Sequence, residues 1–347
     1  MLIVDYIIVN HNRPLKSVRM ISTLVGRSSQ DNMAFVLKPV TRSIFEHSRE
    51  LKKESVEVRQ IRHRVDEDKE NRVLIYDYAT SNVLEMINDC PPLPLQARKA
   101  ILKELGLALK DMHARNWIHL DVKPDNVFID WFVQLGDLDC ALYLTGTHLL
   151  NHEIGKVMWQ SPEGQLGRAM GKHSEVLSLG LLASQIRSLQ SPSFQLYGSF
   201  QCLFVLTGVE LFHLDFDSLS VELERVILDK LLSNFGPLPN ALAKHVDDEK
   251  AGELLKDLWK MIEEDEERAE EYEPFGQWTE ADYPNLDNDA KRLILRMTHL
   301  DPGKRVEMVD IMTDPYWDGV GSMGLLIPKN VLKMMPIKNL TQEKEMT

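Results

Sequence analysis

The sequence predicts an α+β protein in which a small strand-rich part precedes a larger helical part. Up to about residue 76, short runs of β-branched and apolar residues alternate with turn-forming segments, a pattern typical of strands. Beyond Tyr78, apolar residues recur at steps of three and four, which is typical of amphipathic helices. The chain has 347 residues, enough to bury a sizeable core in one large domain or in two lobes.

The strand-rich part is predicted to contain one helix, from about Ser43 to Lys53. The charged segment Asp66–Asn71 is expected to be the turn of a hairpin. The first strand is apolar but carries Asp5 and lacks a basic leader, so it is predicted to be a strand and not a signal peptide. The expected strands are Leu2–Val9, Val18–Val25, Met33–Val40, Val56–Val65 and Arg72–Tyr78.

The helical part is predicted to begin after a boundary near Asp77–Thr80. Its first long helix is indicated by Leu95, Ile101, Leu102, Leu105, Leu109 and Met112. Val176–Leu189 is apolar throughout and is expected to be a deeply buried helix, whereas Glu263–Glu271 is an acidic run typical of a solvated helix face or a mobile loop. The predicted organisation is a first lobe at residues 1–78, a second at 79–317 and a surface extension at 318–347.

Composition restricts the kinds of partner. The net charge is −13, which argues against a nucleic-acid-binding surface. No apolar run approaches the length needed to span a membrane, so we expect no membrane partner. Cys90, Cys140 and Cys202 are far apart without metal-ligand or disulfide spacing, which is typical of reduced thiols inside a cell. The expected location is the cytoplasm, with the nucleus as a further possibility.

The segment 118–139 contains the residue types that phosphoryl transfer requires, in a suitable order. Asp121 can orient and deprotonate a hydroxyl group, and Lys123, two positions later, can reach the transferred phosphate. Asn126 and Asp137 can hold Mg²⁺ against the phosphates of a nucleotide. The sequence therefore predicts Asp121 and Lys123 as catalytic residues, and Asn126 and Asp137 as metal and nucleotide ligands.

These residues resemble the catalytic loop of the protein kinase superfamily, and the likeness runs from about residue 2 to 317. Within it, the chain looks most like the divergent kinase-like proteins of filamentous fungi. The other motifs follow in the family's order: Asp137–Asp139 at the metal-binding position, Trp159–Glu163 at the end of the activation segment, Ser174–Gly180 in the helix that supports the catalytic loop, and Arg305 as partner of Glu163. The resemblance implies a bilobal fold, a small β-rich N-lobe and a larger helical C-lobe.

The same resemblance implies an ATP site in the first lobe. Lys38, in the run Ala34–Lys38, stands where the family has the lysine that contacts the α- and β-phosphates. Its acidic partner stays open between Glu50 and Glu54. Tyr76 would be the gatekeeper, and Asp77–Ala79 the hinge, in which Asp77 and Ala79 would bind adenine through the backbone.

The chain also departs from the family pattern. Asn10–Leu15 has no glycine where a glycine-rich loop normally closes over the phosphates. Leu120 replaces the arginine that normally binds a phosphorylated activation-loop residue, so that kind of control is not expected. Asp139 replaces a glycine and puts an extra carboxylate near the metals, where it assists metal binding or only stiffens the turn. Glu175 replaces the aspartate that supports the catalytic loop.

Three functions compete on these residues. The first is an ATP- and Mg²⁺-dependent Ser/Thr protein kinase, favoured because Lys123-Pro124 follows the catalytic aspartate as in Ser/Thr kinases. The second is a pseudokinase that scaffolds partners and binds nucleotide weakly or not at all, which the missing glycines favour. The third, a small-molecule kinase, is disfavoured by the pairing of Glu163 with Arg305 that is typical of protein kinases.

Overall fold

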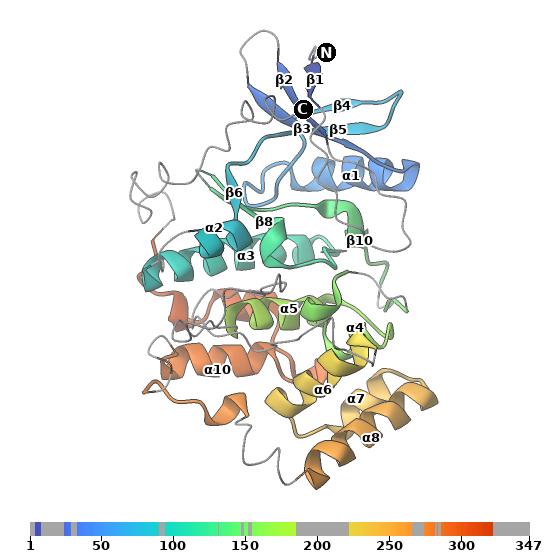
Figure 1. Cartoon of the computed structure of the whole chain (residues 1–347), viewed down its shortest axis with the longest axis vertical. Coiled ribbons are helices and arrows are strands. Elements are labelled where there is room, and N and C mark those ends of the chain that lie inside the picture. Colours follow the sequence, from blue (N-terminus) through green and yellow to red (C-terminus); the bar gives the residue numbers. More distant parts are fainter. Residues whose placement is uncertain are drawn as a thin grey trace, which may run out of the picture.

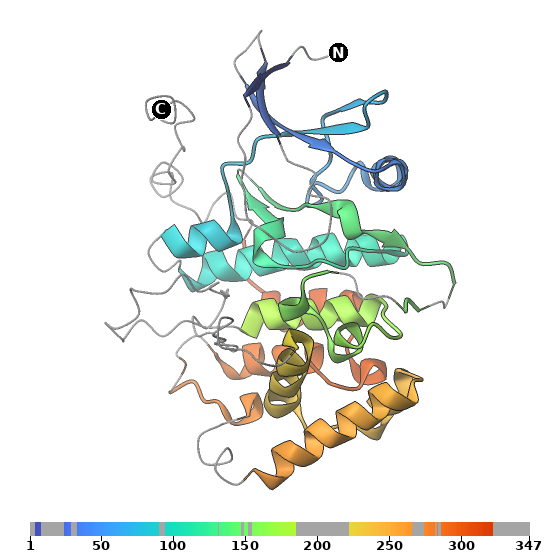
Figure 2. The same cartoon turned by 45° about the vertical axis from the view of Figure 1, so that its right-hand side comes forward.

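The computed structural model describes residues 4–7, 24–28, 33–89, 94–130, 132–146, 149–151, 155–184, 222–265, 274–281, 283 and 286–321. A twisted sheet with one helix lies at one end of the molecule, and a larger helical assembly lies at the other (Figure 1). The turned view in Figure 2 shows the same two-part arrangement. This architecture confirms the predicted α+β class and the bilobal shape.

The N-terminal sheet is antiparallel with the strand order β1-β2-β3-β5-β4. Lys38 pairs with Leu74 in the register of β3 and β5, and Phe35 pairs with Asp77. The sheet is packed on both faces, because one face carries the cluster of Phe35, Leu37 and Ile75 while the other packs against helix α1 (Arg42–Ser55). The strands are β1 Val4–Ile7, β2 Leu24–Ser28, β3 Ala34–Pro39, β4 Asp66–Asp68 and β5 Val73–Asp77.

Helix α1 spans Arg42–Ser55, which confirms the predicted helix with a few more residues at its end. It begins after Thr41, whose side chain accepts a hydrogen bond from the N–H of Ile44 at 3.4 Å. Phe45 joins Val40, Leu74 and Tyr76 in a small core between the helix and the sheet. Lys38 precedes the helix by a few residues, so this packing fixes where its side chain emerges.

The predicted strand Val56–Val65 is wrong, because this segment forms turns and irregular structure. Its apolar residues Val58 and Ile61 are buried in the core of the helical part, and Ile61 makes an isolated bridge to Leu135. These two residues thus pack against the C-lobe, while Val56 and Val65 are exposed, and the segment adds no strand to the sheet.

The hairpin that follows is shifted from its predicted position. Strand β4 lies at Asp66–Asp68, inside the segment that was predicted to be the turn. The turn comes after it, where the Asp68 carboxylate accepts hydrogen bonds from the N–H groups of Glu70 and Asn71 at 3.0 and 3.1 Å. Strand β2 is likewise later than predicted, and residues 18–23 lie outside the described residues.

The chain leaves the sheet at Asp77 and enters the helical part through a short connection. A three-stranded sheet, β6-β8-β9, and the pair β7-β10 lie beside helix α3. The catalytic segment lies between β7 and β8, so both small sheets position it. The bounds are β6 Ser81–Asn82, α2 Val83–Asp89, α3 Leu95–Ala114, β7 Trp117–Ile118, β8 Val127–Ile129, β9 Val133–Leu135 and β10 Leu142–Tyr143.

Two predicted helices are confirmed in this part. Helix α3 buries Ile101, Leu105 and Leu109 in the main core, and helix α5, at Lys172–Ser184, is buried along most of its length. Residues 185–189 of the second prediction lie outside the described residues. The remaining helices of the described residues are α4 Pro162–Gln165, α6 Leu223–Phe235, α7 Asn240–His245, α8 Glu249–Glu264, α10 Asn288–Met297 and α11 Met308–Met312. Single 3₁₀ turns lie at Pro124–Asn126, Leu138–Cys140, Val157–Trp159, Phe275–Gln277, Pro302–Lys304 and Pro315–Trp317.

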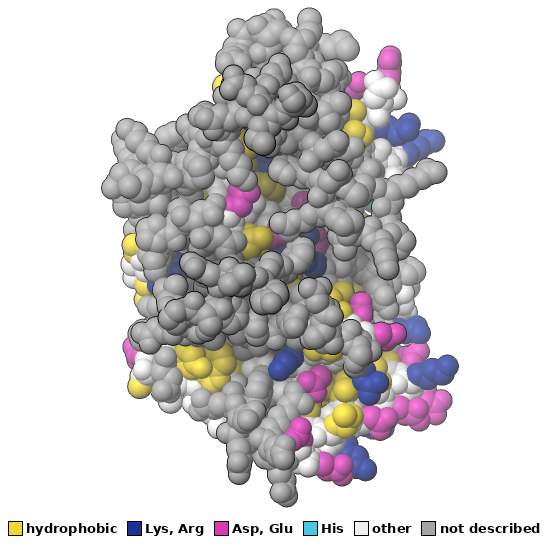
Figure 3. Space-filling view, viewed as in Figure 1, with side chains coloured by type: hydrophobic (Ala, Val, Ile, Leu, Met, Phe, Trp, Pro, Cys, Tyr) yellow, Lys and Arg dark blue, Asp and Glu magenta, His cyan; other side chains and the backbone are white. Residues whose placement is uncertain are grey.

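Helix α8 shows how the surface of the C-lobe is built. Leu255 and Leu258 face the core, while acidic and basic side chains alternate on the outer face in the lower part of Figure 3. At its end, residues 263–265 of the predicted acidic run are exposed, as expected of a solvated helix face, and 266–271 lie outside the described residues. In the part of the chain that the structure describes, no helix combines the length and apolar character needed to cross a bilayer. The limits predicted for the lobes and for the extension stay predictions.

Candidate active site

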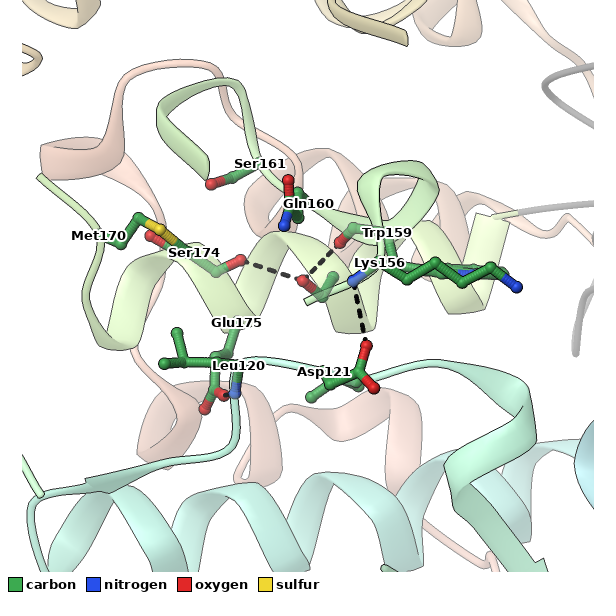
Figure 4. A pocket seen from close by; sticks show the side chains of 11 residues that line it. Leu120, Asp121, Lys156, Trp159, Gln160, Ser161, Met170, Ser174 and Glu175 are labelled. Carbon is green, nitrogen blue, oxygen red and sulfur yellow. Dashed lines mark hydrogen bonds between the residues drawn. The ribbon is translucent and has the colours of Figure 1, made fainter. Parts of the chain in front are cut away.

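The carboxylate of Asp121 is held by three donors from the catalytic segment and the segment after it. Lys123 Nζ lies 2.5 Å and Asn126 Nδ2 lies 3.0 Å from Asp121 Oδ2. The N–H of Lys156 donates to Oδ1 at 3.1 Å, as Figure 4 shows. Because both oxygens are bound and the residue is buried, the carboxylate has a fixed orientation before any substrate arrives.

Glu175, on helix α5, supports the backbone of the catalytic segment. Its Oε1 accepts a hydrogen bond from the N–H of Leu120, and its Oε2 lies 2.8 Å from Nε2 of His113 on helix α3. Leu120 has a φ of +64°, a conformation that costs free energy for a side chain other than glycine. The contact with Glu175 holds this strained turn, which is the role expected for Glu175 from the sequence.

Lys38 connects the N-terminal sheet to the segment after β9. Its Nζ donates to Asp137 Oδ1 and lies 2.9 Å from Asp139 Oδ2. Burial disfavours the ammonium, yet the two carboxylates hold the pKa of Lys38 above its ordinary value. Burial also opposes ionisation of Asp137, but the lysine holds the pKa of Asp137 below its ordinary value, so this pair is charged at neutral pH.

The sequence leaves the partner of Lys38 open between Glu50 and Glu54, and neither of them pairs with it. Glu54 accepts a hydrogen bond from the indole Nε1 of Trp117 at 2.8 Å, and Glu50 is exposed on helix α1. The second carboxylate comes instead from Asp139. Its signal was in the sequence, because an aspartate at a position normally held by glycine adds an acidic group beside Asp137.

The predicted hinge follows directly from strand β5. Tyr76 is buried between the sheet and α1, and Asp77 is the last residue of the strand. The N–H of Tyr78 donates to the carbonyl of Ala34 at 3.1 Å, which ties the start of the connection to β3. Ala79 lies in the connection itself. Sequence analysis missed a neighbour, Arg62, whose guanidinium donates to the carbonyl oxygen of Asp77.

The Asp137 carboxylate and the Asn126 amide supply oxygen ligands of the kind that Mg²⁺ prefers. The amide nitrogen of Asn126 donates hydrogen bonds to Asp121, one of them to the backbone oxygen at 2.8 Å. The amide oxygen of Asn126 is therefore the atom suited to a metal ion. Within the described residues, no group of three or more His, Cys, Asp or Glu side chains forms a complete metal site. The residues fit a magnesium ion whose other ligands are phosphate oxygens and water.

Leu120 lies in an apolar cluster where the family has an arginine. The buried members are Ile118, Leu120, Leu144 and Met170, with Cys140, Leu142 and Leu150 packed around them. This cluster joins the catalytic segment to the segment that follows β10, and Leu150 and Met170 exchange backbone hydrogen bonds of 2.9 Å.

Glu163 and Arg305 form the buried ion pair that the sequence predicts. Their side chains are 0% exposed, and the nitrogen–oxygen distances are 2.5 and 3.0 Å. Ser174 Oγ adds a 2.9 Å hydrogen bond to Glu163, and Arg305 Nε donates to the carbonyl of His299 at 2.7 Å. Burial alone would raise the pKa of Glu163, but the guanidinium holds it below its ordinary value.

Gly155 passes very close to the catalytic segment. Its φ is +96°, and a Cβ placed on it would fall far inside contact distance of the Leu120 carbonyl oxygen. We expect Gly155→Ala to lower the free energy of unfolding by about 3 kcal/mol, because both the φ and the backbone clash oppose a side chain. Gly146→Ala is the matched control, since Gly146 has a φ of +64° but open space around it, and should cost about 1 kcal/mol. Urea denaturation of both variants would measure the difference, and equal losses would show that the close approach is unimportant.

Comparison with known proteins agrees with this geometry. The family model for the protein kinase domain matches residues 46–317. Mitogen-activated protein kinase 14 of Arabidopsis thaliana is 24% identical over 278 residues, which cover 79% of this chain and 64% of that protein. Serine/threonine-protein kinase Pkn1 of Myxococcus xanthus is 28% identical over 145 residues, covering 35% of this chain and 21% of that protein. U-box domain-containing protein 52 of Arabidopsis thaliana is 29% identical over 133 residues, covering 34% and 16%.

The matches thus cover from 16% to 64% of the length of these relatives. The family model, in contrast, covers more than half of this chain and includes the catalytic segment, the Glu163–Arg305 pair and most of the described helices. The chain therefore belongs to the protein kinase domain family.

Proposed function

We propose that this protein is a Ser/Thr protein kinase that transfers the γ-phosphoryl group of ATP to a hydroxyl group of a protein substrate. The observation that carries the proposal is the arrangement around Asp121, with Lys123 at 2.5 Å and Asn126 at 3.0 Å from the same carboxylate oxygen. A carboxylate oriented in this way suits the capture of a substrate hydroxyl. The cytoplasm or nucleus is the proposed location.

Each residue then has a separate task. Asp121 orients the acceptor hydroxyl and receives its proton, while Lys123 neutralises charge that develops on the transferred phosphoryl group. Lys38 binds the α- and β-phosphates, and the backbone of Asp77 and Ala79 receives the adenine. Mg²⁺, when bound, neutralises phosphate charge and aligns the β- and γ-phosphates, and Asn126 and Asp137 would hold it.

The ion pairs of Lys38 are expected to couple the binding of the nucleotide to the binding of the metal ion. Lys38 bonds Oδ1 of Asp137, the proposed metal ligand, as well as Asp139, so the lysine competes with a metal ion for the Asp137 carboxylate. A nucleotide must draw the ammonium toward its phosphates and release Asp137 for the metal. Nucleotide and metal are therefore expected to bind together, each favouring the other.

A pseudokinase is the second candidate, and the same ion pairs favour it. If Lys38 stays with Asp137 and Asp139, neither the phosphates nor the metal gains its ligand. The segment Asn10–Leu15, which lacks glycine, lies outside the described residues. In this alternative the protein acts by binding partners, and nucleotide binds weakly or not at all.

Stabilisation by Mg²⁺-ATP tests the proposed nucleotide site. A ligand that binds only the folded state raises its free energy of unfolding, by about 2.7 kcal/mol at a hundred times the dissociation constant. We expect millimolar Mg²⁺-ATP to raise the melting temperature, and Lys38→Met to remove most of this shift. Lys53→Met is the control, because Lys53 is exposed on α1 and should leave the shift intact.

The same preparations can be assayed for transfer of labelled phosphate from ATP to a basic protein, in Mg²⁺ and in Mn²⁺. Transfer by the wild type above the Lys38→Met background supports the kinase. A nucleotide-dependent shift without transfer to any of a panel of substrates would favour the pseudokinase. If Mg²⁺-ATP did not change the melting temperature at all, the protein would have no ATP site, whether it is a kinase or a pseudokinase.

A further inference from the structure

Arg62 links the N-terminal sheet to the hairpin of β8 and β9. Its backbone N–H donates to the carbonyl of Leu135 on β9 at 2.8 Å. Its guanidinium carbon lies 4.0 Å from the centre of the Phe128 ring on β8 and 5.5 Å from that of Tyr76 on β5. From there the guanidinium donates a hydrogen bond to the carbonyl oxygen of Asp77. One side chain thus contacts both the β5 end of the N-terminal sheet and the β8–β9 hairpin, beside the proposed hinge.

Gly136 gives this side chain its space. A Cβ at Gly136 would lie 2.8 Å from Phe128 Cε2 and 3.1 Å from Arg62 Cδ, both too close for an ordinary contact. Gly136 directly precedes Asp137, so the stem of Arg62 passes beside the start of the metal-binding turn. The guanidinium is therefore positioned by the local packing, with a ring beneath it and a glycine beside it.

The contacts of this guanidinium are those that a nucleobase requires. It is flat, it lies over an aromatic ring, and it donates to a backbone carbonyl of the hinge. An adenine that binds to the same hinge needs an apolar surface for its ring and a carbonyl acceptor for its amino group. While the guanidinium lies over Phe128 and donates to the Asp77 carbonyl, adenine cannot occupy the same space between these two groups.

We propose that Arg62 occupies the nucleobase position of the ATP site and must withdraw for ATP to bind, so that it sets the affinity for the nucleotide. The inference rests on the proposed function, because it takes Asp77 as the hinge residue that receives adenine. It concerns the base and not the phosphates, which belong to Lys38 and the metal ligands.

Withdrawal of Arg62 is physically feasible. Among the ion pairs of the described residues, none includes Arg62, so the carboxylates of Asp130, Asp77 and Asp137 attract the guanidinium only from a distance and not through a direct contact. Burial lowers the pKa of Arg62 below its ordinary value, although an arginine stays charged at neutral pH. Movement into water would restore the hydration of this charge and so offset part of the loss of the ring and carbonyl contacts.

The affinity for ATP follows from this competition. When only a fraction of the molecules has an open base position, the apparent dissociation constant rises by the inverse of that fraction. A hydrogen bond from a charged donor and a cation–π contact together favour the occupied state by roughly tenfold or more. Removing the guanidinium should therefore tighten ATP binding by about that factor.

The test compares the affinities of Arg62→Ala and Arg59→Ala for ATP, adenosine and inorganic tripolyphosphate by titration. Arg59 is the matched control, because its guanidinium also lies over a ring, 5.9 Å from the centre of Phe132, but pairs with Glu104 at 3.2 Å, away from the hinge. We expect Arg62→Ala to bind ATP and adenosine about tenfold more tightly than the wild type, with no gain for tripolyphosphate. Arg59→Ala should match the wild type for all three. Arg62→Leu keeps the hydrocarbon stem and replaces Arg62→Ala if the latter fails to fold.

The two proposals fail in different ways. If the wild type binds ATP and Arg62→Ala and Arg62→Leu bind ATP and adenosine equally or more weakly, Arg62 does not block the base position, and the proposed function stands. A gain for tripolyphosphate as large as that for adenosine would also overturn the inference, since the effect would not concern the base. If neither the wild type nor any variant binds ATP, the nucleotide site itself is refuted together with the role of Arg62.

Discussion

Asp121→Asn is expected to reduce phosphate transfer by about a thousandfold or more while ATP affinity stays close to that of the wild type. The substitution keeps the shape of the side chain but removes the base that receives the proton of the substrate hydroxyl, and general-base catalysis contributes roughly 10² to 10⁴ in rate. Lys123 and Asn126 would also lose the charge that they now contact at 2.5 and 3.0 Å, which adds to the loss. Transfer of labelled phosphate to a basic protein measures the rate, and nucleotide titration measures the affinity.

Asp137→Asn is the companion variant, because Asp137 faces Lys38 and the proposed metal and not the acceptor hydroxyl. It should lose both transfer and Mg²⁺-dependent nucleotide binding. If the wild type transferred no more phosphate than Asp121→Asn, the proposed kinase activity would be refuted. Equal loss of nucleotide binding in both variants would mean that the roles of the two carboxylates are assigned wrongly.

Arg305→Ala should lower the free energy of unfolding by about 3–5 kcal/mol, whether or not the protein is catalytic. The substitution leaves Glu163 as an uncompensated charge in a site where both partners are 0% exposed. It also removes donors from the carbonyls of His299 and His173, at 2.7 and 2.9 Å. Equilibrium denaturation with urea would measure the loss.

Arg42→Ala is the matched control for the charge change. Arg42 is 84% exposed and pairs with Glu46 one helical turn away at 2.8 Å, a contact that water screens and that contributes little to stability. If Arg305→Ala cost no more than this control, the buried pair would not contribute to the stability of the C-lobe. Glu163→Gln, which keeps most of the shape, would then be expected to be equally harmless.

The sequence predicted best where one local pattern decides the structure. Helix α3 and strand β3 follow from uninterrupted periodicity, and each was found at its expected place. The segment Val56–Val65 is also rich in β-branched residues, yet Val58 and Ile61 pack against the C-lobe, so tertiary contacts and not the local pattern decide its conformation. A sequence pattern cannot reveal which distant surface a buried residue will meet.

The same distinction applies to the candidate site. Asp121, Lys123 and Asn126 stand within a few positions of one another, so their spacing alone places them together. The partners of Lys38 are about a hundred positions away, at a separation of 99 for Asp137, and the choice among carboxylates depends on how α1 lies against the rest. Arg62 gave no signal at all, because nothing in a turn-like segment indicates that one side chain will extend across to the hinge.

The apolar cluster around Leu120 has a consequence for how the activity would be controlled in the cell. Hydrocarbon contacts form when the chain folds and do not depend on an added charge, so a bracing cluster of Leu120, Leu144 and Met170 needs no upstream enzyme to complete it. A phosphatase would likewise find no phosphate group to remove from this cluster. We expect the output of such a protein to be insensitive to a kinase or a phosphatase that acts on this segment.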